Sequence, residues 1–114
     1  MSLIYKIIPA ALWRAAQMQG EFRGAPVDLA DGYIHFSTAD QVRVTAARHF
    51  AGQDDLLLLA VEAGGLGNDL RYEPSRGGAL FPHLYAPLPL AAVQWAQPLP
   101  RGSDGAHIFP DLAS

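Results

Sequence analysis

Two histidines and a glutamate are the residues of this chain whose types are best suited to catalysis: His35, Glu73 and His83. An imidazole can take up or release a proton near neutral pH, and a carboxylate can accept a proton or stabilise a positive charge. The three residues lie in different segments, so the fold has to bring them together before they can act on one substrate. We predict that they share one site and are its catalytic groups.

Hydroxyl groups adjoin the first of these histidines. The run Tyr33–Phe36 is β-branched and aromatic, which is typical of a strand, and two hydroxyl residues follow it directly. Thr38 and Gln41 have the spacing of a capping box, so a helix is expected to begin at Ser37 or Thr38. A helix N-terminus favours anions and polar ligand groups. This combination predicts that His35, Ser37 and Thr38 contact a ligand.

Each candidate also has a plain structural interpretation. A histidine in a strand can hydrogen-bond a neighbouring strand, hydroxyls before a helix are commonly caps, and a glutamate at a strand end is commonly solvated. A metal site built from His35, Glu73 and His83 is another alternative. The sequence contains no His-x-His or His-x-x-x-His spacing to support it, so we expect no bound metal.

Composition narrows the classes of function. The chain has 114 residues, which suits a single domain spanning 1–114, and half of them are hydrophobic. Its net charge is −3 and Lys6 is its only lysine, so general nucleic-acid binding is not expected. Cysteine is absent, and the longest apolar run, Leu56–Val61, is too short to span a membrane. We expect a cytoplasmic protein with no membrane segment.

Short strands and two helices have to position the candidate residues. Strands are predicted at Leu3–Ile8, Tyr33–Phe36, Leu56–Glu62, Leu70–Glu73 and Ala91–Ala96, and helices at Ala10–Gln19 and from Thr38 to about Ala51. The leucine-rich strand is apolar on both faces and is therefore expected to be central. Prolines at 82, 87 and 89 indicate that Leu80–Tyr85 is irregular or an edge segment. We interpret Glu21–Ala30 as a polar connection. Early helices and late strands favour an α+β fold.

Two motifs in these segments match a known family. They are Asp-Gly-Tyr-Ile-His-Phe-Ser-Thr at residues 31–38 and Phe-Pro-His-Leu-Tyr at residues 81–85. The chain resembles the domain-of-unknown-function 952 (DUF952) family of small bacterial proteins over nearly its whole length. The resemblance implies a fold similar to that of ADP-ribosyltransferases, with twisted, mostly antiparallel β-sheets, two main helices and a central cleft.

The same resemblance implies a nucleotide as ligand and NAD as substrate. Bacterial ADP-ribosylating toxins carry a similar Asp-Gly-Tyr-x-Ser-Thr-Ser strand before a helix, hold NAD in a cleft and break its nicotinamide–ribose bond. They also use a late glutamate, for which Glu73 is the match, and an arginine or histidine on the first strand, where this chain has Tyr5 and Lys6. The residues expected to contact NAD are Tyr5, Lys6, His35, Ser37, Thr38 and Tyr85.

Two functions remain open at this point. One is an NAD-dependent transferase of the ADP-ribosyl or phosphoribosyl type. The other is a module of the same fold that binds a small metabolite or a protein partner without catalysis. The absence of an arginine or histidine from the first strand favours the second function.

Overall fold

The computed structural model describes residues 2–113, which form an α+β fold of antiparallel strands and three α-helices. The eight strands of this range are Leu3–Pro9 (β1), Glu21–Phe22 (β2), Ile34–His35 (β3), Leu56–Glu62 (β4), Leu70–Pro74 (β5), Leu80–Leu84 (β6), Leu88–Pro89 (β7) and Val93–Pro98 (β8). The helices are Ala10–Gln19 (α1), Pro26–Asp31 (α2) and Val42–His49 (α3), and short 3-10 turns span Ala63–Asp69, Arg76–Gly78 and Leu90–Ala92. None of the helices in residues 2–113 has both the length and the apolar character needed to cross a bilayer.

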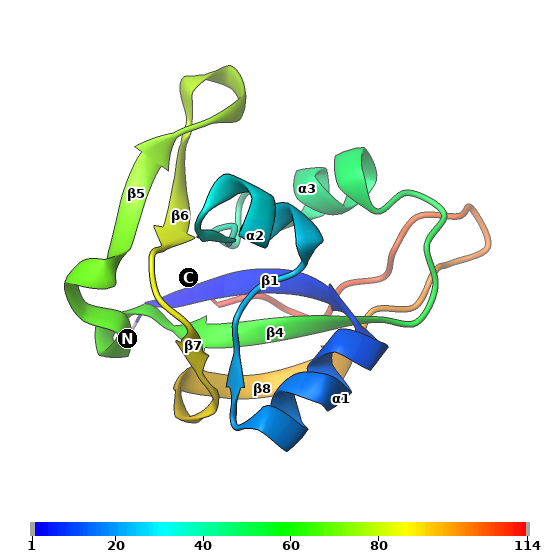
Figure 1. The fold of residues 1–114 in the computed structure, drawn as a ribbon. Helices are drawn as coiled ribbons and strands as arrows, with labels where there is room; N and C mark the ends of the chain where they lie inside the picture. The colour runs from blue at the N-terminus through cyan, green and yellow to red at the C-terminus, as the bar shows by residue number, and fades with distance from the viewer. Residues whose placement is uncertain (1, 114) are drawn as a thin grey trace.

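β4 is the middle strand of a three-stranded sheet, between β1 and β8 (Figure 1). Its residues are apolar on both faces because each face is covered by a separate part of the core. Leu59 and Val61 belong to one buried cluster, whereas Leu58 and Ala60 belong to a second. The prediction that the leucine-rich segment is a buried central strand is confirmed.

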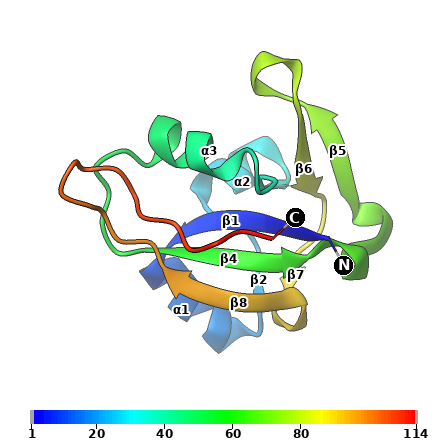
Figure 2. The ribbon, with the colours of Figure 1, turned by 180° about the vertical axis from the view of Figure 1, so that it is seen from behind.

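The two core clusters lie on opposite faces of this sheet, because side chains alternate along a strand. Trp13 of α1 packs against the first cluster, which also contains Ala16. Val42 of α3 lies in the second cluster, which is further covered by Phe109 from the C-terminal segment. Figure 2 shows this segment running alongside β1 on the face of the sheet away from α1.

A second three-stranded sheet has the order β3-β6-β5, and its β5–β6 hairpin rises away from the first sheet (Figure 1). The prediction that Leu80–Tyr85 is irregular or an edge segment is therefore wrong, because β6 is the central strand. Pro82 pairs with Tyr72 of β5, and its carbonyl oxygen accepts a hydrogen bond of 3.0 Å from the Phe36 amide. In an antiparallel strand the N–H and C=O of one residue face the same neighbour. The N–H that proline lacks would therefore face Phe36, just beyond the end of β3. Its absence removes no hydrogen bond between β6 and β5.

α2 and the start of α3 also differ from expectation. The segment Glu21–Ala30 is more than a polar connection, because it contains β2 and most of α2. α2 has only six residues, too few to show a hydrophobic period, although Pro26 at its first position is a typical helix start. α3 begins at Val42, after a turn. The Gln41 side chain accepts a hydrogen bond of 3.0 Å from the Thr38 amide, which is half of the expected capping box.

The two large sheets are joined at one point. Tyr5 of β1 and Ser37 exchange both backbone hydrogen bonds, each of 2.8 Å. Lys6, the next residue of β1, reaches the carbonyl oxygen of His35 at 2.9 Å. The first strand therefore fixes the position of β3 and of the histidine on it.

Candidate functional site

His35 and His83 occupy paired positions on β3 and β6, and their rings are 5.7 Å apart. Arg71 of β5 pairs with His83 from the other side. Ile34 of β3 and Leu84 of β6, the residues next to the two histidines, point to the opposite face and into the first core cluster. Because side chains alternate along a strand, both histidines lie on the outer face of the second sheet. Two residues predicted from separate segments are thus adjacent.

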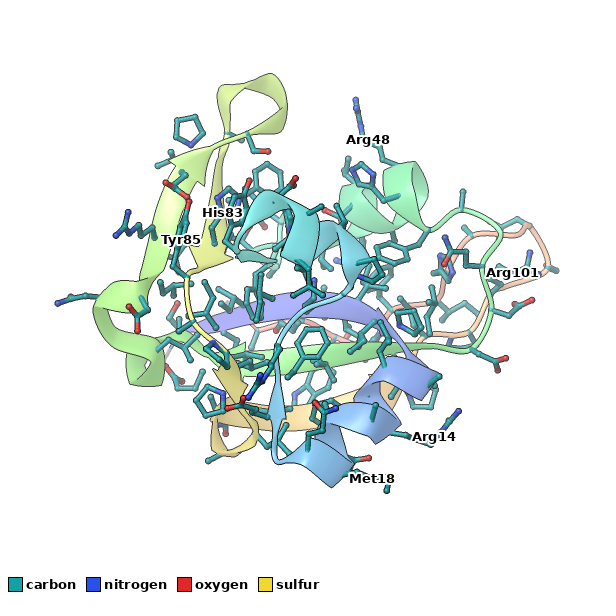
Figure 3. All side chains as sticks on the ribbon, in the orientation of Figure 1. Arg14, Met18, Arg48, His83, Tyr85 and Arg101 are labelled. Atoms are coloured by element: carbon teal, nitrogen blue, oxygen red, sulfur yellow. The ribbon has the colours of Figure 1, made fainter. Side chains whose placement is uncertain are left out.

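Glu73 joins the histidines on this face. Its Oε1 lies 2.9 Å from His83 Nδ1 and accepts a hydrogen bond of 2.7 Å from the Tyr85 hydroxyl. An ionised carboxylate can only accept, so the imidazole Nδ1 donates this hydrogen bond. The hydrogen bonds from Tyr85 and His83 lower the pKa of Glu73, and the same contact raises the pKa of the Tyr85 phenol. Figure 3 shows His83 on β6 beside α2, with Tyr85 following the strand.

A buried ion pair between Asp28 and Lys6 holds His35 from the interior side of the protein. Asp28 Oδ1 lies 2.6 Å from His35 Nδ1, and Asp28 Oδ2 lies 3.2 Å from Lys6 Nζ. Asp28 is 1% exposed and also accepts from the backbone amides of Ala25 and His35 at 2.7 and 3.1 Å. Burial raises the pKa of Asp28, but its hydrogen bond with His35 and the charge of Lys6 outweigh burial and lower it overall. This network fixes the orientation of the His35 ring.

A second aspartate faces the other side of the same ring. Asp31 Oδ2, at the end of α2, lies 2.9 Å from His35 Nε2. Its side chain is 47% exposed, in contrast with that of Asp28. His35 therefore has a buried carboxylate at one nitrogen and an exposed carboxylate at the other.

Tyr33 covers the histidines. Its ring is stacked on His83, with 4.1 Å between centroids and 29° between planes, and lies 4.6 Å from the His35 ring. The Tyr85 ring is 5.2 Å away. His83 is only 4% exposed as a result of its packing. A ligand on this face therefore meets the tyrosines before it meets His83.

Charges of both signs surround the tyrosines. Burial raises the pKa of the Tyr33 phenol, and the negative charges of Asp31 and Glu73 raise it further. The Arg71 guanidinium carbon lies 4.8 Å from the centre of the Tyr85 ring. The face thus offers aromatic surface beside one exposed and one partly exposed carboxylate, with one arginine at its edge.

Three of the predicted contact residues lie away from this cluster. Tyr5 is fully buried in the second core cluster, where its hydroxyl donates to the Ala113 carbonyl oxygen. The Ser37 hydroxyl lies 2.8 Å from the Thr45 hydroxyl, and Thr38 forms the turn before α3. The hydroxyls do not cap α3, because that helix begins at Val42. Lys6, His35 and Tyr85 do join the cluster, although Lys6 lies behind Asp28.

Sequence reasoning missed four members of the site: Asp28, Asp31, Tyr33 and Arg71. Asp28 falls in the segment interpreted as a polar connection, and Asp31 follows that segment directly. A signal for Tyr33 was present, because it shares the alternation that puts His35 on one face. A similar signal was present for Arg71. It lies two residues before Glu73 on β5, so the two side chains share one face of the strand.

Among the described residues, one concavity lies next to this cluster and another lies away from it. One, of about 290 Å³, lies between α3 and the tip of the β5–β6 hairpin and is lined by Asp40, Gln41, Val44, Arg48, Gly77 and Phe81. The other, of about 410 Å³, is lined by residues of α3 and the C-terminal segment. Phe81 pairs with Glu73 across the ladder, so the first concavity adjoins the cluster. Within residues 2–113, no group of three or more His, Asp or Glu side chains is arranged to hold a metal ion.

Solved structures of one bacterial protein are similar to this chain. The crystal structure of protein CC0527 from Caulobacter crescentus is 53% identical, with a TM-score of 0.91, and the match covers 94% of each chain. The solution NMR structure of CC0527 is 55% identical, with a TM-score of 0.84, over 93% of this chain and 91% of that one. No curated protein matches the chain. The family described as protein of unknown function (DUF952) matches residues 7–96. This match covers most of the sequence, and the chain belongs to that family.

Proposed function

We propose that the outer face of the β3-β6-β5 sheet binds a nucleotide of the NAD type and promotes loss of its nicotinamide, in a fold related to that of ADP-ribosyltransferases. One observation carries the proposal: the Tyr33 ring packs against both histidines of the cluster. The carboxylates of Asp31 and Glu73, one exposed and one partly exposed, are bound to these histidines on the same face. The nicotinamide ring of NAD is an aromatic cation. Aromatic faces and carboxylates both attract such a ring.

The chemistry would depend on Glu73. In the reaction, the bond between ribose C1′ and the nicotinamide nitrogen breaks, and its electron pair leaves with the nicotinamide. The ribose becomes an oxocarbenium ion, which an oxygen nucleophile captures with loss of a proton. Glu73 Oε1 is occupied by His83 and Tyr85, whereas Oε2 takes part in neither bond. A carboxylate oriented in this way can stabilise the sugar cation as it forms.

His83 has a supporting role in this proposal. It is buried beneath Tyr33 and donates to Glu73, so it orients the carboxylate from behind. His35 is the more exposed of the two histidines and can meet a polar group of the ligand. This division assigns the predicted catalytic residues different parts of one site.

Calorimetry with oxidised and reduced NAD tests the binding. NADH has the same phosphates and adenine but lacks the positive ring. A cation–aromatic contact at an exposed site contributes about 0.5–1 kcal/mol, so NAD⁺ should bind about two- to fivefold more tightly than NADH. Equal affinity for the two would contradict a contact between the nicotinamide ring and this face. The absence of heat from either nucleotide at millimolar concentration would refute nucleotide binding.

A second candidate is a binding module that lacks catalysis. It is favoured because two groups expected to contact NAD have partners within the protein instead. Lys6 is paired with buried Asp28, and the Ser37 hydroxyl is paired with Thr45. Chromatographic measurement of nicotinamide released from NAD separates the two functions. Binding without release supports the module, and release that requires Glu73 supports the transferase.

A further inference from the structure

The two nitrogens of His35 face two carboxylates that differ in burial. Asp28, at Nδ1, is enclosed by the protein, and Asp31, at Nε2, is half-exposed. Carboxylates at neutral pH have no proton to donate. Both contacts are hydrogen bonds only when both ring nitrogens carry protons.

We propose that His35 is held as an imidazolium whose Nε2–H is the hydrogen-bond donor for a ligand oxygen, and that Asp31 occupies the position which that oxygen would take. The inference rests on the proposed function, because it concerns the same face and the same ligand. It adds the atom that the ligand must supply: a carbonyl, carboxylate or phosphate oxygen.

The contact with Asp28 is permanent. Its carboxylate is fixed by Lys6 Nζ at 3.2 and 3.3 Å and by the Ala25 amide at 2.7 Å. The amide and carbonyl of His35 are bonded to Asp28 and Lys6 respectively, so the backbone and the ring are held together. Asp28 is therefore a positioning residue, which sets the direction in which Nε2 points.

The contact with Asp31 can be exchanged. Asp31 lies at the last position of α2, before Gly32, and its side chain is 47% exposed. An ion pair at the surface contributes little to stability, so its loss on ligand binding is a small cost. The rings of Tyr33 and His83 also face His35. A ligand oxygen at Nε2 would lie beside the Tyr33 ring, where the nicotinamide is proposed to bind.

Nitrogen-15 NMR of the imidazoles tests the protonation state without any nucleotide. In the free protein near neutral pH, both nitrogens of His35 should show shifts of protonated nitrogen. Asp28→Asn should abolish this signature, whereas Asp31→Ala should leave Nδ1 protonated. A wild-type His35 with one unprotonated nitrogen would overturn the proposal, and this measurement does not depend on whether Asp28→Asn folds.

Inorganic phosphate tests the exchange at Nε2. Removing the competing carboxylate in Asp31→Ala should tighten phosphate binding, with the largest shift change at His35 Nε2. Asp111→Ala is the matched control, because it removes an exposed carboxylate from the C-terminal segment, outside the cluster. Equal phosphate affinity in the two variants, or a response centred elsewhere, would overturn the exchange. Phosphate binding here together with failure of NAD to bind would reject the proposed function and retain this inference.

Discussion

His35 and His83 lie opposite each other on paired strands, yet their imidazoles have different partners. His83 has one carboxylate, at Nδ1, and His35 has one at each nitrogen. The first arrangement needs a proton on one ring nitrogen, and the second makes two hydrogen bonds only when both nitrogens carry one. Neighbouring titratable groups with such different surroundings are typical of sites in which one group donates a proton and the other accepts it.

Replacing Glu73 by glutamine should impair catalysis with little effect on folding. If the transferase proposal holds, Glu73→Gln should lower the rate of nicotinamide release about 10²-fold, because the oriented negative charge at the sugar is lost. Chromatography measures the release, and a thermal melt checks the fold. Asp111→Asn, an exposed carboxylate outside the cluster, is the control. An undiminished rate in Glu73→Gln would show that this carboxylate is not involved.

Removing Asp28 should destabilise the protein strongly. Asp28→Ala leaves Lys6 buried without its counter-ion, which costs about 3–5 kcal/mol of unfolding free energy. Adding Lys6→Met should restore about 1–3 kcal/mol, because the unpaired charge is then absent. Urea denaturation measures both changes. A double variant as unstable as Asp28→Ala alone would mean that the backbone contacts of Asp28 matter more than its pairing with Lys6.

Stability should fall in acid partly through Asp28. Its folded pKa lies below the ordinary aspartate value of 3.8, so the unfolded state takes up the proton first. The stabilisation is complete above the unfolded pKa and is lost as the pH falls through the folded one. Unfolding free energies measured between about pH 2 and about pH 7 should therefore decline less steeply in Asp28→Asn than in the wild type. Parallel curves would contradict the assigned pKa shift.

Tyr33 should control access to His83. Tyr33→Ala removes the ring stacked on this imidazole, whereas Tyr33→Phe keeps it. Diethyl pyrocarbonate modifies accessible imidazoles, and peptide mass spectrometry can follow the four histidines separately. Tyr33→Ala should increase modification most at His83, and Tyr33→Phe should resemble the wild type. A uniform increase in modification at all four histidines would instead indicate that the variant is less stably folded as a whole.

Strand alternation made the core of the site predictable. The pattern Tyr33-Ile34-His35-Phe36 puts its first and third residues on one face, and the structure has both in the cluster. The α+β class also follows from the sequence. The distance along the chain between Glu73 and His35 hides their proximity, because long-range pairing of β6 with both of their strands brings them together.

The missed residues have local causes. α2 is shorter than two helical turns, so its aspartates show no periodic pattern. Ser37 follows the histidine strand closely, but it pairs with Tyr5 of the first sheet and its hydroxyl turns towards α3. Local motifs could not show that the chain leaves one sheet for another between His35 and Ser37.

Pro82 provides the physical reason for that departure. Opposite Phe36, β6 offers the Pro82 carbonyl as an acceptor, but proline has no N–H to donate to the Phe36 carbonyl in return. The chain instead meets a complete pair of partners on Tyr5. A ring with no N–H, placed within a strand, thus routes the polypeptide between sheets and ends the histidine-bearing strand after two residues. Any residue with an amide hydrogen at this position would offer the chain a competing path.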